Sequence, residues 1–396
     1  MITLEELGKR LRQARVVAGY TQEEAGQALG LDDTAIAKIE RGKRGVGALE
    51  IKRLASLYGV SVDDLLDDPF AEGLVQLEIA LRSVEAGNNP KVETMKRQMQ
   101  RLVSDDHWLR EGEAETDGAW ESLAPDIPQD LLDYERGYRA AELFRERYEL
   151  GDSPIPDLAM LADEVGVVVA RLPLRDIGSP DGCSALDPET EAAYILINSD
   201  KSRVRRRFTI AHELGHLVAG HLRRGQVVID ETLNEREPQE REANAFAAGL
   251  LMPESSVLGA VERLMKRFGE DDPVGWIVWL ADSFGVSEEA AAYRLVNIGL
   301  TRVAGGATRD AVRGVAEDQE GLREARVRLG LSLATRDSER GVTEVGPSMR
   351  ARVAHALEAG AISVDGAAGM LHLSPEDTYR WIAESGIRLG AVEAPL

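Results

Sequence analysis

The segment that constrains this chain most runs from Arg207 to Leu217 and reads Arg-Phe-Thr-Ile-Ala-His-Glu-Leu-Gly-His-Leu. In an α-helix, residues four positions apart lie one above the other on the same face. His212 and His216 can then direct ring nitrogens at one point, with Glu213 beside them. Two imidazoles suit Zn²⁺, and an adjacent carboxylate can move a proton from water to a leaving amine. The spacing predicts a zinc site for peptide hydrolysis, with Glu213 as general base.

The residues that surround this motif are mostly apolar, which indicates that the motif is carried into the protein interior. They are Phe208, Ile210, Ala211, Leu214, Leu217 and Val218. Isolated polar groups are costly in an interior. A single buried histidine is often only a core residue with satisfied hydrogen bonds. Two at this spacing, with a glutamate between them, favour zinc binding instead.

A zinc of this kind needs a third protein ligand and an open position for water. Residues 237–253, which contain prolines near both ends, predict the helix that supplies this ligand. Glu240 shares a face with small alanines that allow close approach, and Asn244 one turn later can hydrogen-bond a ligand histidine. Glu242 points about 160° away from Glu240, so both cannot be ligands. The face favours Glu240; Glu242 is the alternative ligand or a solvated charge.

These segments, together with Asn198, resemble the ImmA/IrrE family of zinc metallopeptidases. The likeness covers roughly residues 131–300. It implies a thermolysin-like zincin site in which His212, His216 and Glu240 hold Zn²⁺. It also implies a class of substrate, because several members of the family act on helix-turn-helix repressors.

The first 66 residues predict short helices separated by tight turns. Thr21 to Glu24 form a capping box that starts a second helix, and a third begins at Asp32 or Asp33 after a short turn. Two helices joined in this way are typical of the helix-turn-helix, whose second helix enters the major groove. The stretch from Leu7 to Leu66 resembles the Xre or lambda-repressor-like DNA-binding domains.

This second resemblance implies a set of DNA contacts. They are a phosphate contact by Gln22 and base-edge contacts by Asp33, Thr34 and Lys38. Three basic residues are expected to attract phosphates: Arg41, Lys43 and Arg44. Residues 1–60 hold ten Lys or Arg and eight Asp or Glu, whereas the whole chain has a net charge of −22. Asp32 and Asp33 would repel the DNA backbone, so a purely protein-binding role for this unit is the alternative.

Length and patterning predict four segments. They are a helix-turn-helix domain (1–68), a helical hairpin with an acidic linker (69–130), a metallopeptidase domain (131–300) and a helical region of unknown role (301–396). Within the second segment, the acidic linker is expected from residue 104. The fold class expected is mostly α with a small mixed sheet: a five-helix DNA-binding domain, a zincin-like α+β domain and a helical C-terminal region. Residues 166–172 and 191–198 predict strands, the latter at a sheet edge where it pairs with substrate backbone.

Composition and the chain start predict the compartment. One cysteine cannot form an internal disulfide, which fits a reducing cytoplasm. The chain begins without a basic and apolar leader, and it contains no apolar run of about 18 residues. We expect a cytoplasmic protein that does not enter a membrane and that binds a double-stranded DNA operator as a homodimer.

Two further residues have alternative roles. His221 can stabilise a developing oxyanion or orient substrate, or it can simply complement the dipole at a helix end. Cys183 can act as an inhibitory thiolate ligand at the open zinc position, or it can be a small buried side chain.

Two functions follow from these patterns. In the first, a DNA-binding transcriptional regulator carries a zinc endopeptidase that cleaves a repressor-like protein, in trans or within its own chain, in a stress or mobile-element response. In the second, the zinc domain does not cleave and serves as a ligand sensor or dimerisation module. Four residues together favour the first function: His212, Glu213, His216 and Glu240.

Overall fold

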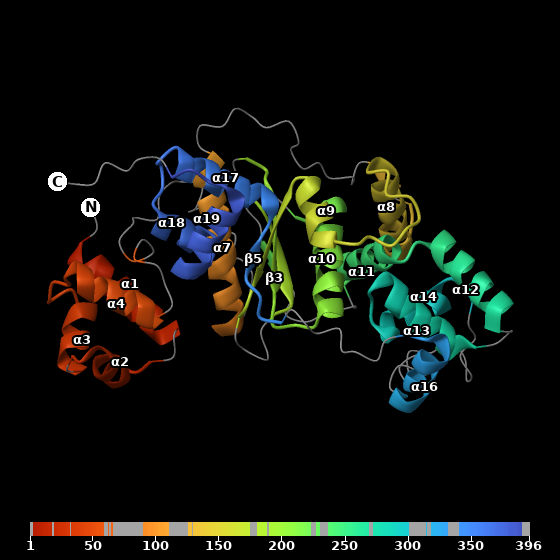
Figure 1. Cartoon of the computed structure of the whole chain (residues 1–396), viewed down its shortest axis with the longest axis horizontal. Helices are drawn as coiled ribbons and strands as arrows, with labels where there is room; N and C mark the ends of the chain where they lie inside the picture. Colours follow the sequence, from red (N-terminus) through yellow and green to blue (C-terminus); the bar gives the residue numbers. More distant parts are fainter. Residues whose placement is uncertain are drawn as a thin grey trace.

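The structure is a computed structural model that describes the following residues: 3–17, 20–31, 33–58, 62, 65, 90–110, 126–128, 130–174, 180–187, 190–222, 227–229, 237–268, 272–300, 314, 318–331 and 340–389. Helices dominate these residues, and a single mixed sheet lies among them (Figure 1). The expected fold class, mostly α with a small mixed sheet, is confirmed. None of the helices that the structure describes combines the length and hydropathy needed to span a bilayer.

The first described unit is a small helical domain with its own core. Its helices are α1 (Leu4–Val17), α2 (Gln22–Leu29), α3 (Asp33–Glu40) and α4 (Ala48–Tyr58). Leu11, Ile36 and Leu54 are almost fully buried between them. Of the fifth helix expected here, only Val62 and Leu65 are described; both are helical, and Leu65 is buried in the same core. The order and short turns of α2 and α3 are those predicted for a helix-turn-helix.

Five strands form the mixed sheet in the order β4-β2-β3-β1-β5. They are β1 (Val167–Leu172), β2 (Gly182–Leu186), β3 (Ala193–Asn198), β4 (Val227–Ile229) and β5 (Glu344–Val345). β3 pairs in parallel with β1 and antiparallel with β2. The prediction that residues 191–198 form an edge strand is therefore wrong. The run Ala-Tyr-Ile-Leu-Ile in β3 is buried on both faces, as a central strand requires.

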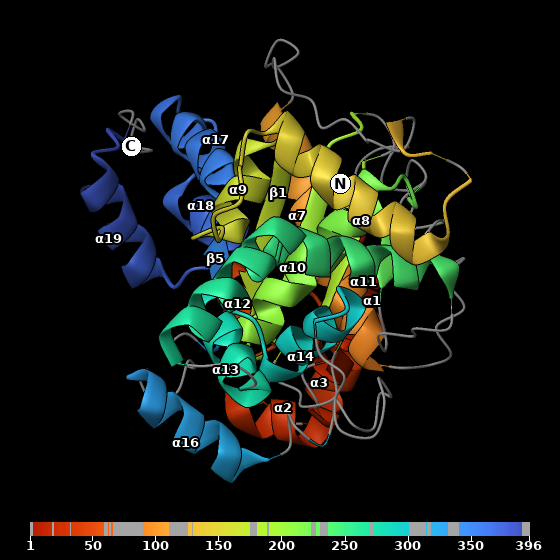
Figure 2. The ribbon, with the colours of Figure 1, turned by 90° about the vertical axis from the view of Figure 1, so that its right-hand side faces the viewer.

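Helices cover both faces of the sheet. One face packs against α8 (Asp133–Arg147), α9 (Leu158–Glu164), α10 (Arg203–Val218) and α11 (Pro238–Leu251), with α12 (Glu254–Phe268), α13 (Pro273–Phe284), α14 (Glu288–Asn297) and α16 (Gln319–Leu329) beyond them. The other packs against α7 (Pro90–Arg110), α17 (Pro347–Glu358), α18 (Val364–Met370) and α19 (Pro375–Ser385). Figure 1 shows the sheet between the two groups, and Figure 2 looks onto the first. Ile195 and Tyr194, adjacent in β3, belong to opposite cores.

Segments on either side of residues 131–300 pack against the sheet or pair with it, which the sequence did not predict. α7 continues to Arg110, seven residues into the expected acidic linker, and β5 pairs with β1. Asp106 is fully buried and accepts hydrogen bonds from Tyr194 at 2.9 Å and from Arg110 and Arg352 at 2.7 Å. Its charge is satisfied by partners far away in the sequence, so the acidic composition there does not indicate solvent exposure.

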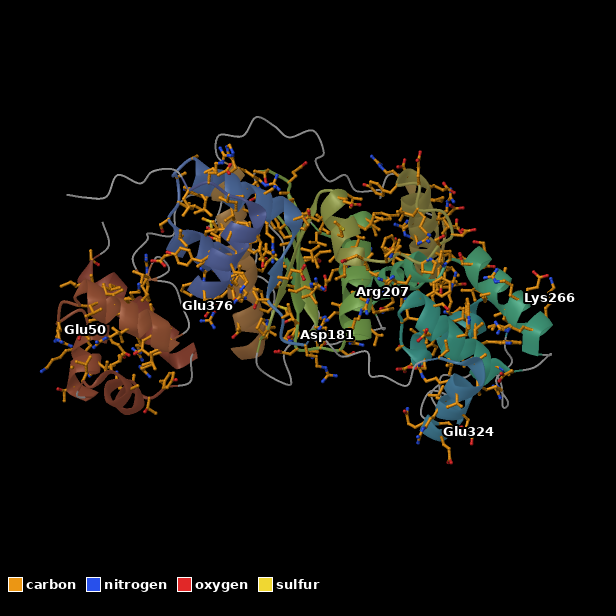
Figure 3. All side chains as sticks on the ribbon, in the orientation of Figure 1. Glu50, Asp181, Arg207, Lys266, Glu324 and Glu376 are labelled. Atoms are coloured by element: carbon orange, nitrogen blue, oxygen red, sulfur yellow. The ribbon has the colours of Figure 1, made fainter. Side chains whose placement is uncertain are left out.

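Arg207, which Figure 3 labels, stands at the start of the central motif in α10. Its side chain joins α10 to neighbouring elements. Its guanidinium donates to the carbonyl of Phe284 at 3.2 Å, where α13 ends, and to the carbonyl of Ile155. Burial lowers the pKa of Arg207 to about 10. The hydrogen bonds to backbone carbonyls offset part of the cost of burying this charge.

The helices α8 and α11 approach each other closely at Gly137. A Cβ at this position would lie 2.1 Å from the carbonyl oxygen of Glu242 and 2.7 Å from the Cβ of Ala245. Both neighbours are parts of α11 that cannot rotate away. Only glycine therefore permits this distance between the two helices, and α11 carries several of the polar residues described below.

We predict that Gly137→Ala lowers the free energy of unfolding by about 1–3 kcal/mol, the usual cost of overpacking a core. The control is Gly259→Ala in α12, where the new Cβ would meet only the flexible end of Arg263 at 3.3 Å. That substitution should be neutral or stabilise by up to about 1 kcal/mol, since alanine favours helices. Thermal and urea unfolding measure both. Equal stability of the two variants would contradict the tight contact.

Candidate metal centre

The helix α10 begins at the surface and carries its motif into the core. Ser202 caps it by accepting a hydrogen bond from the backbone N–H of Arg205. One turn later the side chains become buried, and the exposed fractions of His212, Glu213 and His216 are 0%, 0% and 1%. The apolar neighbours of the motif correctly indicated this burial.

Three polar side chains converge beside this helix. His212 Nε2 and His216 Nε2 are 3.1 Å apart, and the carboxylate of Glu240 on α11 lies 3.3 Å from the first nitrogen and 3.4 Å from the second. The three donor atoms all lie within 4.8 Å of one another. Gly215 allows the two helices to meet, because a Cβ there would lie 3.1 Å from the Cα of Ala243.

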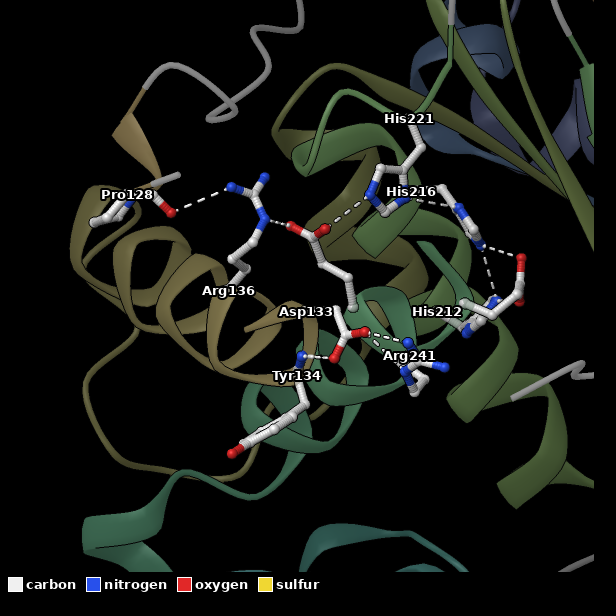
Figure 4. A network of polar contacts seen from close by, with 10 residues as sticks. Pro128, Asp133, Tyr134, Arg136, His212, His216, His221 and Arg241 are labelled. Carbon is white, nitrogen blue, oxygen red and sulfur yellow. Dashed lines mark hydrogen bonds and ion pairs between the residues drawn. The ribbon is translucent and has the colours of Figure 1, made fainter. Parts of the chain in front are cut away.

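The partner of His212 determines which of its nitrogens faces the cluster. His212 Nδ1 lies 3.1 Å from Asn244 Oδ1 (the histidines of this network are labelled in Figure 4). An amide oxygen only accepts hydrogen bonds, so Nδ1 carries the proton and the lone pair of Nε2 points at Glu240. Asn244 thus lies where the sequence placed it, against a histidine of the motif.

Charge and burial suit the residues for holding a divalent cation. Burial alone would raise the pKa of Glu240, but the imidazole groups of His212 and His216 beside it hold this pKa well below its usual range. Burial lowers the pKa of His216. At neutral pH Glu240 is therefore a carboxylate and His216 a neutral imidazole, the protonation states that ligands need. Glu240 Oε2 is buried without a well-aligned hydrogen bond from any described residue, which a cation would compensate.

The position of Glu242 differs from the expectation of a solvated charge. Its side chain is 7% exposed, and its carboxylate lies between His221 Nε2 at 3.2 Å and Arg136 Nε at 3.1 Å. Burial alone would raise the pKa of Glu242, but the hydrogen bonds from His221 and Arg136 lower it. His221 Nδ1 in turn lies 3.0 Å from His216 Nδ1. These contacts form the chain of polar groups in Figure 4.

Glu213 has a partner that the sequence did not reveal. Ser184 on β2 is fully buried and donates from Oγ to Glu213 Oε2 at 2.6 Å. The only local signal was a hydroxyl alternating with small apolar residues in a strand. Cys183, its neighbour, points to the core on the opposite face of the sheet. Its role is that of a small buried side chain, and the thiolate switch is not supported.

The proposed DNA contacts lie on or near α3. Thr34, Lys38, Arg41 and Lys43 are exposed. Arg44 is partly buried and forms an ion pair of 2.9 Å with Glu50, which Figure 3 labels. Asp33 begins α3, but its side chain lies outside the described part of the structure.

Gln22 is already engaged within its own domain. Its amide donates at 2.7 Å to Glu40, and the same carboxylate forms a buried ion pair of 2.5 Å with Arg15. A phosphate contact by the Gln22 side chain would require this hydrogen bond to be exchanged.

Comparison with known proteins divides the chain into two matched regions. Residues 6–68 match the model of a helix-turn-helix domain, and residues 162–296 match that of the IrrE N-terminal-like domain. The second region includes all three convergent side chains.

Individual relatives match one region each. ImmR, an HTH-type transcriptional regulator of Bacillus subtilis, is 43% identical over 60 residues, which are 15% of this chain and 47% of ImmR. YazB, an uncharacterized HTH-type transcriptional regulator of the same species, is 40% identical over 58 residues, 15% of this chain and 84% of YazB. The radiation response metalloprotease IrrE of Deinococcus radiodurans is 36% identical over 141 residues, 35% of this chain and 39% of IrrE.

The aligned segments span less than half of ImmR and of IrrE. The two regions nonetheless lie in one chain and in the order that the sequence motifs indicated. The chain therefore joins an N-terminal helix-turn-helix domain to an ImmA/IrrE-like domain.

Proposed function

We propose that this protein is a DNA-binding transcriptional regulator with a zinc-dependent endopeptidase domain. Its substrate is a repressor-like protein, cleaved in trans or within its own chain, in a stress or mobile-element response. The observation that carries the proposal is the buried meeting of His212, His216 and Glu240 beside Glu213. Two histidines and one glutamate, with a further carboxylate next to them, form the donor set of a peptidase site.

Each residue has a defined task in peptide hydrolysis. His212, His216 and Glu240 hold the cation. Zn²⁺ bound there supplies Lewis acidity and makes a water nucleophilic near neutral pH. Glu213 takes the proton of the attacking water and delivers it to the leaving amine. Ser184 orients Glu213 by its hydrogen bond to Oε2.

The sheet order supports a different substrate strand from the one expected. β4 pairs with β2 and lies at one edge of the described sheet, and β2 carries Ser184. An extended substrate segment that paired with β4 would extend the sheet at the edge next to β2, the strand whose Ser184 donates a hydrogen bond to Glu213.

Regulation through DNA is supported by the helix-turn-helix unit and by its relatives, which are named transcriptional regulators. The exposed side chains of α3 and of the following turn include Lys38, Arg41 and Lys43. In a symmetric homodimer, two such helices would occupy major grooves about one helical turn apart on a double-stranded operator.

Zinc content tests the ligand set. We expect His212→Ala, His216→Ala and Glu240→Ala each to lose most of the bound zinc, whereas Glu213→Gln retains it because Glu213 acts on water. Elemental analysis of the purified variants measures this. Full zinc in Glu240→Ala would refute its role as the third ligand.

Cleavage tests the reaction. Glu213→Gln keeps the size of the side chain but removes the base. The rate of cleavage of candidate repressors should therefore fall by about 10²–10⁴-fold or more. Mass spectrometry of the products and zinc analysis of the same samples provide the measurement. Cleavage by neither protein, with zinc bound to both, would favour the non-cleaving sensor or dimerisation module. Equal cleavage by both would assign the activity to another residue.

DNA binding has its own test. Replacing Arg41 and Lys43 with Gln should weaken binding to all sequences and reduce the salt dependence by about one counterion for each lost phosphate contact. Lys38→Ala should mainly relax base preference, by about 1–3 kcal/mol at one position. Mobility-shift titrations at several salt concentrations measure both. Absence of DNA binding, with capture of a repressor-like protein by the same domain, would make this unit a substrate-docking adaptor.

A further inference from the structure

Behind the candidate metal ligand His216 lies a continuous row of polar groups from three elements. His221 follows the end of α10, and its backbone N–H donates to the carbonyl of His216 at 2.9 Å. This turn brings the two rings together, with centroids 5.1 Å apart and Nδ1 atoms 3.0 Å apart. Glu242 of α11 and Arg136 of α8 complete the row at 3.2 Å and 3.1 Å.

With a neutral imidazole at His221, the hydrogen bonds in this row can be satisfied in one direction only. Arg136 always donates, and a carboxylate only accepts. Glu242 therefore requires a proton on His221 Nε2, which leaves His221 Nδ1 as an acceptor. That acceptor requires the proton of His216 on its Nδ1, so the lone pair of His216 lies on Nε2, the atom that faces His212 and Glu240.

The direction of these hydrogen bonds matters because the side chains that form them are buried. The side chains of His221 and Glu242 are each 7% exposed, and that of Arg136 is 16% exposed. Little water is available to replace a lost partner, and an unsatisfied buried group is costly. A simple interaction of His221 with the helix dipole would need neither Glu242 nor the ring contact with His216.

We propose that His221 is a positioning residue for the metal: it holds His216 in the tautomer that binds a cation through Nε2, and Glu242 and Arg136 hold His221. The proposal rests on the metal site proposed above. It gives three residues of α11 separate tasks, because Glu240 is a ligand, Asn244 orients His212 directly, and Glu242 orients His216 through His221.

The affinity of the full chain for Zn²⁺ tests the proposal, measured by competition with a chromophoric chelator. His221→Ala and Glu242→Gln should each weaken binding by about 10–100-fold, the usual effect of losing a partner behind a ligand. His221→Asn should retain most of the affinity, because its amide oxygen can occupy the position of Nδ1 as an acceptor. A purely space-filling role of His221 would not distinguish Asn from Ala in this way.

Two comparisons separate positioning from general stability. In the His221→Ala background, Glu242→Gln should cause little further loss, since it acts through the missing ring. Arg241→Ala is the matched control: Arg241 also joins α11 to α8, donating to Asp133 at 2.8 Å, but it does not contact the row (Figure 4). It should leave zinc affinity and the Co²⁺ absorption spectrum unchanged, whereas His221→Ala changes both.

The outcomes are distinguishable. Unfolding of the metal-free variants identifies any that fail to fold, and only folded variants are compared. If the unaltered chain binds no zinc, the metal site itself fails and the positioning role with it. If the unaltered chain binds zinc and His212→Ala does not, but His221→Ala and Glu242→Gln stay within about twofold of the unaltered affinity, the positioning role alone is refuted. Equal losses in Arg241→Ala and Glu242→Gln would also refute it, since helix docking would then explain both.

Discussion

The close contact between α10 and α11 is the constraint on which the rest of the site depends. Polar side chains from both helices meet in an interior where each needs a partner. The contact is possible because Gly215 and Ala243 occupy little space, and α11 is held from behind by α8 at Gly137. A wider spacing would separate Glu240 from the histidines. The small residues of the motif therefore matter as much for its chemistry as the histidines do.

The part of the site that lies within single helices could be predicted from sequence. The spacing of His212 and His216 has one geometric meaning on a helix, and the alanine face of residues 237–253 selects Glu240 over Glu242 as the residue near them. Asn244 follows from the same periodicity. The helices α2 and α3 of the helix-turn-helix could be predicted for a similar reason, because capping and turn residues determine where a helix begins and ends over only a few positions.

Features that depend on distant partners could not be predicted. Glu242 and Asp106 have the composition of surface charges, but their partners lie 106 residues away at Arg136 and 246 residues away at Arg352. Ser184 meets Glu213 across 29 residues and a strand-to-helix contact. The central position of β3, by contrast, could have been predicted from the sequence. Its unbroken apolar run indicates a strand that is buried on both faces.

The return of residues 340–389 to the sheet has a consequence for the synthesis of the protein. Tyr194 and Leu196 of β3 pack into the core that contains Met349 and Val353 of α17. Until residues 340–389 have left the ribosome, one face of the sheet lacks much of its cover, and β1 lacks its neighbour β5. Such long-range contacts form slowly and leave apolar surface exposed meanwhile. A nascent chain would thus carry its helix-turn-helix unit well before the sheet is fully covered, so a ribosome that stalls late would release a fragment with that unit but with an incompletely packed candidate metal centre.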